Sequence, residues 1–329
     1  MRPTRRWWAV LLTVPLLIMT ACTAGGSASS GGGNQQAATA TKNLHFAVVT
    51  HATSGDPFWE IVKSGVEKAE KKYGVEVTYH GSGQPLKQAQ MVRTAIDKNV
   101  DGLVVSMAAP DALKGAVNDA VQADIPVIVI NAGIDAWQDV GAMTYIGQTN
   151  FGAGKGAGSK LAEAGVQHLV CVIHEAGNVS LAQRCKGANA GFDGQQTKLQ
   201  VDINNLAEAT SRIEAKLASD QSIDGILTLN PAVAIAARDA IRNAGLQDKV
   251  TLATFDLSGD VIEAIQEGQI LFAVDQQPYL QGYLPVSFLW LYNHNLNTVG
   301  GGQPVLTGPG FVTQENADKV AKYAERGTR

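Results

Sequence analysis

Cysteine is scarce in this sequence, and the positions of the cysteines do not favour a metal site. The chain has 329 residues and three cysteines, at positions 22, 171 and 185. His168, Cys171 and His174 lie close together in sequence, but on a strand the two histidines face one side and Cys171 faces the other. The three side chains cannot converge on one ion, so we predict no metal there.

The sequence also lacks an excess of basic residues and, after its first twenty residues, any long apolar run. It has 26 lysine and arginine residues against 30 aspartate and glutamate residues. No basic patch stands out against this background, which argues against a nucleic-acid partner. No later segment approaches the roughly 20 apolar residues that span a bilayer.

The signatures of two enzyme classes are missing or incomplete. The folded part contains no Gly-x-Ser-x-Gly turn, so a hydrolase of that type lacks its nucleophile. Residues 152–157 match the loose dinucleotide pattern G-x-G-x-x-A, and Glu175 follows at about the distance of a ribose-binding acid. Three residues separate these glycines from the preceding strand, where the motif needs a tight turn. A small-residue face that packs a helix against the sheet explains them more simply.

The N-terminal 43 residues predict export and anchoring. Three arginines precede an apolar stretch at residues 7–18, which is typical of a signal peptide, here residues 1–21. Small residues then precede Cys22, a pattern that resembles a bacterial lipobox and implies lipidation of that cysteine. The alternative is an ordinary secretory signal with an incidental cysteine. Residues 22–43 are nearly all small or polar and predict a flexible tether. We expect a lipid-anchored protein at the extracytoplasmic face of a cell membrane, with no other membrane contact.

If Cys22 is lipidated, two cysteines remain. In an oxidising compartment the simplest arrangement is a disulfide between Cys171 and Cys185. Closing a loop of about 15 residues stabilises a fold by about 3 kcal/mol through lost chain entropy. The alternative is two unpaired buried thiols.

Short apolar runs alternate with helical patterns twice along the chain. In the first half we expect strands at 44–50, 75–79, 103–105 and 126–130, with helices at 58–73, 86–98 and 112–122. In the second half we expect strands at 169–174, 199–203, 226–228 and 251–255, with helices at 180–195, 211–218 and 232–243. Valine and isoleucine runs without polar alternation are typical of parallel strands buried on both faces. The sequence therefore predicts two α/β halves built from right-handed βαβ units.

Polar and aromatic side chains follow these strands at the edge where such sheets bind ligands. They are Asp56, Phe58, Trp59, Asn131, Arg184, Asn230, Asp256 and Gln276. Carboxylates, amides and an arginine bind sugar hydroxyls through strong hydrogen bonds, and aromatic faces cover the apolar side of a sugar ring. Trp137, in a polar loop, is a further candidate wall of the site. The two aspartates could instead cap helices, and the aromatics could be core residues.

At these residues the chain resembles periplasmic binding proteins of the ribose-binding type, which are type I solute-binding proteins of ABC transporters. The resemblance runs from Leu44 to about Thr313. It is carried by Asp56–Trp59, Gln84-Pro85, Ile125–Val129, Arg184 followed by Gly191-Phe192, Asn230, Phe255-Asp256 and Gln276–Pro278. Position by position, it implies ligand contacts from the eight residues above, with Gln84 and Asn205 as weaker matches.

The resemblance also implies a domain plan. Two doubly wound parallel-sheet α/β domains are joined by a three-strand hinge. The N-terminal domain comprises residues 44–147 plus about 278–307, and the C-terminal domain comprises residues 148–277 plus about 308–329.

One departure from the family affects specificity. Sugar binders of this kind often carry Asp-Arg where this chain has Asn131-Ala132, so a bidentate clamp on ring hydroxyls is lost. A sugar alcohol, a different aldose or an inositol therefore stays open as the ligand.

The implied function is the substrate-binding component of an ABC importer. Such a component captures a sugar or polyol by hinge closure and serves an ABC permease and its ATPase. We expect a monomer without catalytic residues or cofactor. The alternatives are a sensory receptor for a sugar-like signal, a nucleotide-dependent enzyme that uses residues 152–157, and a surface adhesion module.

Overall fold

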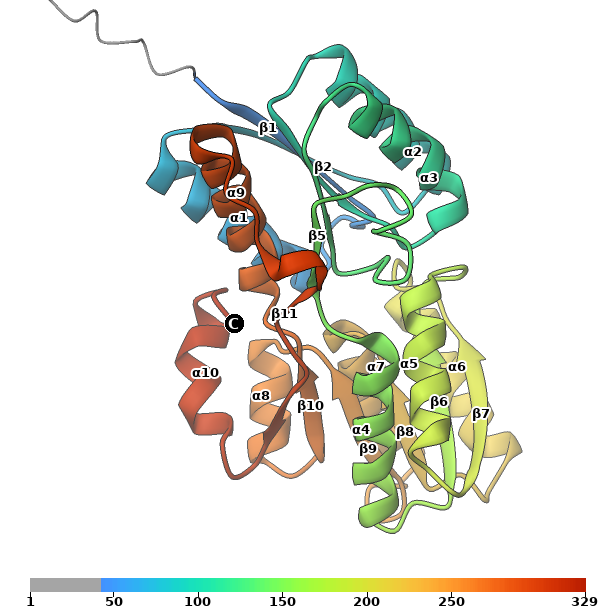
Figure 1. The fold of residues 1–329 in the computed structure, drawn as a ribbon. Coiled ribbons are helices and arrows are strands. Elements are labelled where there is room, and N and C mark those ends of the chain that lie inside the picture. Colours follow the sequence, from blue (N-terminus) through green and yellow to red (C-terminus); the bar gives the residue numbers. More distant parts are fainter. Residues whose placement is uncertain (1–42) are drawn as a thin grey trace, which may run out of the picture. The chain divides into compact units, whose positions relative to one another are not determined.

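The computed structural model describes residues 43–329, which form two α/β lobes (Figure 1). The predicted signal peptide, Cys22 and all but the last residue of the predicted tether lie outside the described residues. None of the helices in residues 43–329 combines the length and the apolar composition that crossing a bilayer requires.

Lobe 1 is a six-stranded parallel sheet with the strand order β11-β5-β4-β3-β1-β2. Its strands are β1 (His45–Thr50), β2 (Glu76–Gly81), β3 (Gly102–Ser106), β4 (Val127–Ile130), β5 (Thr144–Gly147) and β11 (Val305–Leu306). Helices α1 (Pro57–Tyr73) and α9 (Pro278–Asn295) pack on one face, and α2 (Pro85–Asp97) and α3 (Pro110–Gln122) pack on the other. The central strands are buried on both faces, as their valine and isoleucine content predicts.

Lobe 2 repeats this plan with the strand order β12-β10-β9-β8-β6-β7. Its strands are β6 (His168–Ile173), β7 (Gln195–Gln200), β8 (Gly225–Thr228), β9 (Thr251–Phe255), β10 (Phe272–Asp275) and β12 (Gly310–Thr313), and β12 alone among them runs antiparallel. Helices α4 (Asn150–Glu163) and α5 (Val179–Ala190) cover one face. The other face carries α6 (Leu206–Ser219), α7 (Pro231–Asn243), α8 (Gly259–Gln266) and α10 (Ala317–Glu325). The predicted pair of doubly wound α/β domains is confirmed.

The chain passes between the lobes three times. The crossovers are residues 148–149, 276–277 and 307–309, and a short 3-10 helix, η1 (Gly300–Gly302), precedes the last strand of lobe 1. Hydrogen bonds tie the second and third crossovers together. The Thr307 hydroxyl donates to the backbone carbonyl of Gln276 at 2.7 Å. The side-chain Nε2 of Gln277 donates to the backbone carbonyl of Thr307 at 2.7 Å. These three crossover segments form the hinge that the family plan implies.

The strand predicted at 199–203 is wrong. The structure has β7 at Gln195–Gln200, and α5 ends at Ala190 instead of running to 195. β7 lies at the edge of its sheet, and its residues are exposed or half-buried. An edge strand needs no apolar run, so its sequence carried no strand signal.

The glycines of residues 152–157 lie inside α4. Gly154, with Gly158 one turn later, packs α4 against another helix, α5, whereas Gly156 faces the ring of Phe311 on β12 of the sheet. A Cβ atom at Gly154 would lie 2.1 Å from the carbonyl oxygen of Arg184, and one at Gly158 would lie 2.1 Å from that of Ala188. The dinucleotide motif requires its glycines in a turn between strand and helix, so this position removes the basis of the nucleotide hypothesis. The predicted disulfide is present and joins Cys171 on β6 to Cys185 on α5.

Candidate functional site

Side chains from both lobes converge on a buried chamber at the carboxyl ends of the strands. We define the chamber by the residues that line it: His51, Asp56, Phe58, Trp59, Asn131, His174, Glu175, Asn178, Ser180, Leu181, Arg184, Leu229, Asn230, Asp256 and Gln276. The set includes all eight residues that the family match predicts as ligand contacts. The structure therefore brings together residues that lie up to 220 positions apart, from Asp56 to Gln276.

Asp56 is held at the start of α1 by two hydrogen bonds. Its Oδ1 accepts from the backbone N–H of Phe58 at 3.0 Å and from Nδ2 of Asn230 at 3.0 Å. The first bond caps α1, and the second joins lobe 1 to lobe 2. Asn230 in turn caps α7 by accepting from the N–H of Ala232 at 2.8 Å. Burial raises the pKa of Asp56 to about 6. Capping and a place in the chamber are thus compatible roles.

Asn131 and Asp256 occupy equivalent positions in the two lobes. Asn131 follows β4 with φ of 61°, and Asp256 follows β9 with φ of 69°. Asparagine and aspartate tolerate this left-handed conformation better than most residues. Each donates its backbone N–H to the next strand of its sheet, to Ile146 at 3.0 Å and to Val274 at 2.8 Å. The same turn thus places one polar side chain from each lobe at the chamber.

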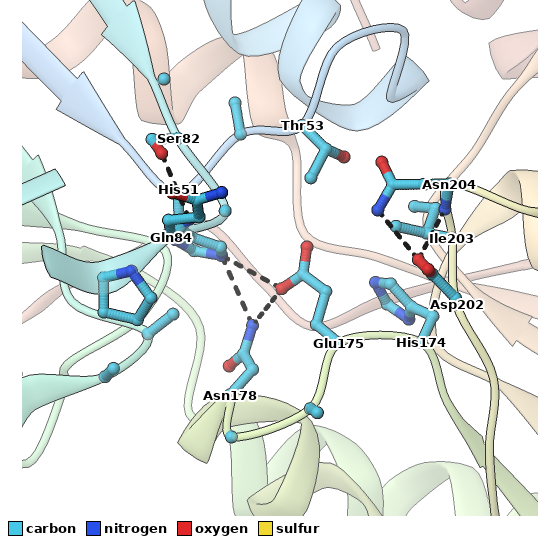
Figure 2. Close-up of a pocket in the computed structure, with 18 of the residues that line it drawn as sticks. His51, Thr53, Ser82, Gln84, His174, Glu175, Asn178, Asp202, Ile203 and Asn204 are labelled. Carbon is cyan, nitrogen blue, oxygen red and sulfur yellow. Dashed lines mark hydrogen bonds and ion pairs between the residues drawn. The ribbon is translucent and has the colours of Figure 1, made fainter. Parts of the chain in front are cut away.

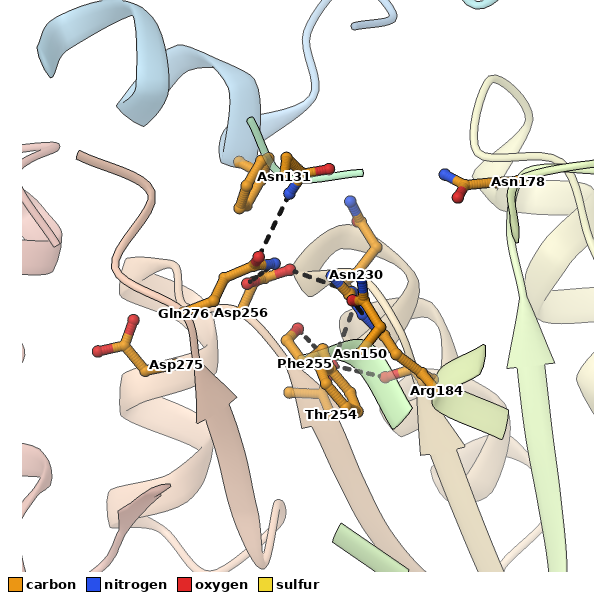
Figure 3. A network of polar contacts seen from close by, with 12 residues as sticks. Asn131, Asn150, Asn178, Arg184, Asn230, Thr254, Phe255, Asp256, Asp275 and Gln276 are labelled. Carbon is orange, nitrogen blue, oxygen red and sulfur yellow. Dashed lines mark hydrogen bonds and ion pairs between the residues drawn. The ribbon is translucent and has the colours of Figure 1, made fainter. Parts of the chain in front are cut away.

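Gln276, in the second crossover, joins these two side chains (Figure 3). Its Nε2 donates to Oδ1 of Asp256 at 2.8 Å, and its Oε1 accepts from Nδ2 of Asn131 at 3.3 Å. Gln281 on α9 also donates to that Oε1, at 3.1 Å, and to the Thr307 hydroxyl at 3.2 Å. The network therefore runs from lobe 1 through the hinge into lobe 2.

Arg184 is the one arginine in the chamber lining, and it is almost fully buried. Its Nε donates to Oδ1 of Asn150 at 2.9 Å, and its Nη1 lies 3.9 Å from Oδ2 of Asp256. The guanidinium also lies 4.7 Å from the centre of the Phe255 ring, which fixes its plane. Burial raises the pKa of Asp256 to about 7 and outweighs the opposing effects of Arg184 and of the hydrogen bond from Gln276.

Phe58 and Trp59 form an apolar wall of the chamber on the lobe 1 side. Their rings are perpendicular, with centroids 5.0 Å apart. Both also belong to the core cluster between the lobe 1 sheet and α1. The two interpretations of these aromatics, as core and as chamber wall, therefore both hold.

The structure does not bring three of the predicted site residues into the chamber. Trp137 is a correction: it is 5% exposed and lies in the core beneath α2 and α3, because successive turns after Gly133 direct it inward. Asn205 is exposed and caps α6 through the N–H of Glu208. Gln84 is exposed at the start of α2 and lines a larger neighbouring hollow.

Sequence reasoning missed several polar residues of the site. His51 directly follows β1, and His174 and Glu175 directly follow β6, so the strand-end rule could have found them. Glu175 accepts a hydrogen bond from Nδ2 of Asn178 at 2.7 Å and lies 3.8 Å from Nε2 of His51. Burial lowers the pKa of His174 to about 4, so this imidazole is neutral at pH 7. Gln281 lies within a helix and carried no sequence signal.

Within residues 43–329, no group of three or more histidine, cysteine, aspartate or glutamate side chains is placed to hold a metal ion.

Comparisons with known proteins identify the family of the chain. Residues 46–294 match the family described as the periplasmic binding protein domain. The chain is 25% identical to the xylose/arabinose-binding protein of Sulfolobus acidocaldarius, over 82% of this chain and 70% of that protein. It is 25% identical to the ribose import binding protein of Haemophilus influenzae, over 76% of this chain and 85% of that protein.

A solved structure is more similar still. The carbohydrate transporter from Acidothermus cellulolyticus 11B, in complex with myo-inositol, is 42% identical, with a TM-score of 0.85 over 87% of this chain and 100% of that chain. From the matched family model and the two-lobed fold, we conclude that the chain belongs to the periplasmic binding protein family.

Proposed function

We propose that this chain is the substrate-binding component of an ABC importer and that it takes a cyclic polyol, with myo-inositol as the first candidate. The observation that carries the proposal is the buried polar set from both lobes, in which Arg184, Asp256, Asp56 and the amides converge on one chamber. The 42% identical relative with bound myo-inositol supports this choice of ligand over an aldose.

The chemistry of the chamber suits a ring that carries several hydroxyls. The carboxylates of Asp56 and Asp256 accept from hydroxyl hydrogens, and Arg184 donates to hydroxyl oxygens. Phe58 and Trp59 offer apolar faces to the C–H bonds of the ring. Asn131 and Ala132 leave the lobe 1 strand end without the Asp-Arg pair of many family members, so the charged contacts come mainly from lobe 2 and from Asp56.

Binding would use movement of the two lobes about the three crossovers. The chamber leaves only about 30 Å³ free, because Asp56 bonds to Asn230 and Asn131 bonds to Gln276 across the lobes. A six-membered ring therefore enters after the lobes separate, and its hydroxyls replace these bonds. The ligand favours the closed form by as much as its affinity for that form exceeds its affinity for the open form.

We also propose a domain organisation and a location for this protein. We place the domain boundaries at the crossovers, which separate residues 44–147 and about 278–307 from residues 148–277 and about 308–329. The protein would act as a monomer, held by a lipid on Cys22 at the extracytoplasmic face. There it would deliver its ligand to a membrane permease and its ATPase.

Titration calorimetry against a panel of cyclic polyols, linear polyols and monosaccharides tests the ligand class. We expect one site per chain and the tightest binding for myo-inositol. Heat from ribose or xylose but none from any inositol would replace the polyol with an aldose. No heat and no thermal stabilisation across the whole panel would reject the sugar-like ligand altogether.

A further inference from the structure

A second hollow, the outer cleft, lies beside the chamber and is lined by both lobes. Lobe 1 contributes residues 51–54, 81–85, 87, 88, 108 and 109, and lobe 2 contributes residues 174–178, 200–204, 208 and 212. Its volume is about 750 Å³, within the range of roughly 300–1,000 Å³ that is typical of small-molecule sites. The chamber alone does not account for this space.

The outer cleft adjoins the chamber. His51, His174, Glu175 and Asn178 line both hollows and therefore form the junction between them. Figure 2 shows the contacts that hold this junction, in which Asn178 and Glu175 of lobe 2 meet His51 of lobe 1. A substituent on a ring in the chamber could pass this junction into the outer cleft.

One atom at the junction has an unmet hydrogen-bonding capacity. The His174 side chain is more than nine-tenths buried, and its Nδ1 has no hydrogen-bond partner within residues 43–329. Buried polar atoms are normally paired, so an unpaired one beside two hollows points to a ligand or water that completes it. The other members of the junction are fixed: Nδ1 of His51 lies 2.7 Å from the Ser106 hydroxyl.

The lining of the outer cleft indicates the chemistry of what it holds. It contains no aromatic ring of the phenylalanine, tyrosine or tryptophan type, but it is rich in hydroxyl and amide groups, such as those of Thr53, Ser54, Gln84, Gln200 and Asn204. Its charged side chains are two cations, Lys87 and Arg212, against three anions, Glu175, Asp202 and Glu208. The small negative excess disfavours a phosphate, and the neutral groups suit ring hydroxyls.

Building on the proposed function, we propose that the outer cleft is a second subsite and that the chain takes a cyclic polyol with a neutral sugar joined to it by a glycosidic bond. The polyol ring occupies the chamber, the glycosidic oxygen lies at the junction near His174, and the sugar ring occupies the outer cleft. Free myo-inositol then fills only the inner half of the site.

Calorimetry with three probes tests this: myo-inositol, a galactosyl-myo-inositol and myo-inositol 1-phosphate. Two to three extra hydrogen bonds of ordinary strength predict that the galactoside binds about tenfold tighter or more than myo-inositol. We expect the phosphate to bind less tightly than the galactoside. A galactoside no tighter than myo-inositol would overturn the subsite, and a phosphate tighter than the galactoside would overturn its neutral class.

Two exposed positions allow the outer cleft to be filled without touching the chamber. Ser54→Trp narrows it from lobe 1, and Asn204→Trp narrows it from lobe 2. Each should weaken galactoside binding by about tenfold, the gain assigned to the extra bonds, and leave myo-inositol binding within about twofold. Gln247→Trp, exposed and outside both hollows, is the matched control and should change neither.

The outcomes separate the two proposals. Equal weakening of both ligands by Ser54→Trp and Asn204→Trp, or no effect on the galactoside, rejects the outer subsite while the proposed function stands. If neither myo-inositol nor the galactoside binds the unaltered protein, the proposed function itself fails.

Discussion

After β4, lobe 1 places the neutral Asn131 at the chamber, and at the equivalent point after β9, lobe 2 places the carboxylate of Asp256. The backbone is the same in both, with a left-handed residue that donates its N–H to the next strand. Lobe 2 adds Arg184 beside its carboxylate, whereas lobe 1 adds the rings of Phe58 and Trp59. The same strand plan thus supplies charged side chains from lobe 2 and, from lobe 1, an apolar wall with Asp56 beside it.

The helix pairs beside the chamber follow the same comparison. In lobe 1, glycines bring α1 and α9 together: a Cβ at Gly282 would lie 1.9 Å from the carbonyl oxygen of Val62. In lobe 2, Gly154 and Gly158 do so for α4 and α5. In lobe 2 a disulfide also joins α5 to the sheet, from Cys185, the neighbour of Arg184, to Cys171 on β6. The segment of α5 that carries Arg184 is therefore tied covalently to the sheet.

Removing the disulfide is the change we expect to have the largest effect. The double variant Cys171→Ala, Cys185→Ala opens a closed loop of about 15 residues and should lower the free energy of unfolding by about 3 kcal/mol. Chemical denaturation measures this, and the oxidised parent protein is the control. A loss below about 1 kcal/mol would show that close packing of α4 on α5 suffices to hold Arg184.

Arg184→Ala and Asp256→Ala test whether the charged face of lobe 2 dominates binding. Each leaves a buried polar partner unpaired, which costs about 1–3 kcal/mol and predicts about 5- to 150-fold weaker binding of myo-inositol. Asn131→Ala, the equivalent neutral change in lobe 1, should cost less. Calorimetry with myo-inositol measures all three, and circular dichroism checks that the fold is retained. Equal losses for Asn131 and Asp256 would contradict the proposed division of roles.

Gln281→Met tests the link between the lobes through the hinge. Gln281 orients Gln276, whose amide joins Asn131 to Asp256. Losing hydrogen bonds of this kind predicts about fivefold weaker binding, near 1 kcal/mol. Ser287→Ala is the control, since this buried serine on the same helix bonds only within α9. If the two variants weaken binding equally, Gln281 has only a structural role.

A change of pH should have the smallest of these effects, and it should act on the stability of the ligand-free protein. Burial raises the pKa values of Asp56 and Asp256 to about 6 and about 7, above the usual 3.8. Between about pH 4 and pH 7 these two carboxyls hold protons in the folded state that they lose in the unfolded state, so their contribution to stability falls as the pH rises. His51 and His174, whose pKa values burial lowers, contribute in the opposite direction over this range. Separation of the lobes lets water reach both carboxylates, which keeps the effect modest. Thermal unfolding of the parent protein and of Asp256→Asn across this pH range isolates the contribution of this carboxyl: without it, stability should fall less, or rise more, as the pH rises. An identical pH dependence of the two proteins would contradict the assignment.

Much of the fold could be predicted from the sequence because its central strands are buried on both faces. Runs such as Val127–Ile130 and Thr251–Phe255 can be recognised as strands from their apolar composition. The edge strand β7 cannot be recognised in this way, because its polar residues are exposed or half-buried and the strand pairs with only one neighbour, β6. The role of Gly154 could not be predicted for another reason: only the tertiary structure shows that it packs against α5.

The candidate site could be predicted wherever a polar residue directly follows a strand, as Asn131, Asp256 and Gln276 do. The same rule applies to His51, but no motif in the sequence around this histidine marks it as a site residue. Trp137 was misplaced because a loop of turns can direct a side chain inward as easily as outward. Gln281 required the tertiary structure, since its partners come from the crossovers and not from its own helix.

Hydrogen exchange measured by mass spectrometry, with and without saturating myo-inositol, tests most directly that one ligand joins both lobes. The account predicts slower exchange at the start of α1, around Asp56 to Trp59, and on α5 and after β9, around Arg184 and Asp256. The rest of each lobe should change little. Protection confined to one lobe, or absent at saturation, would contradict a chamber that closes on its ligand from both sides.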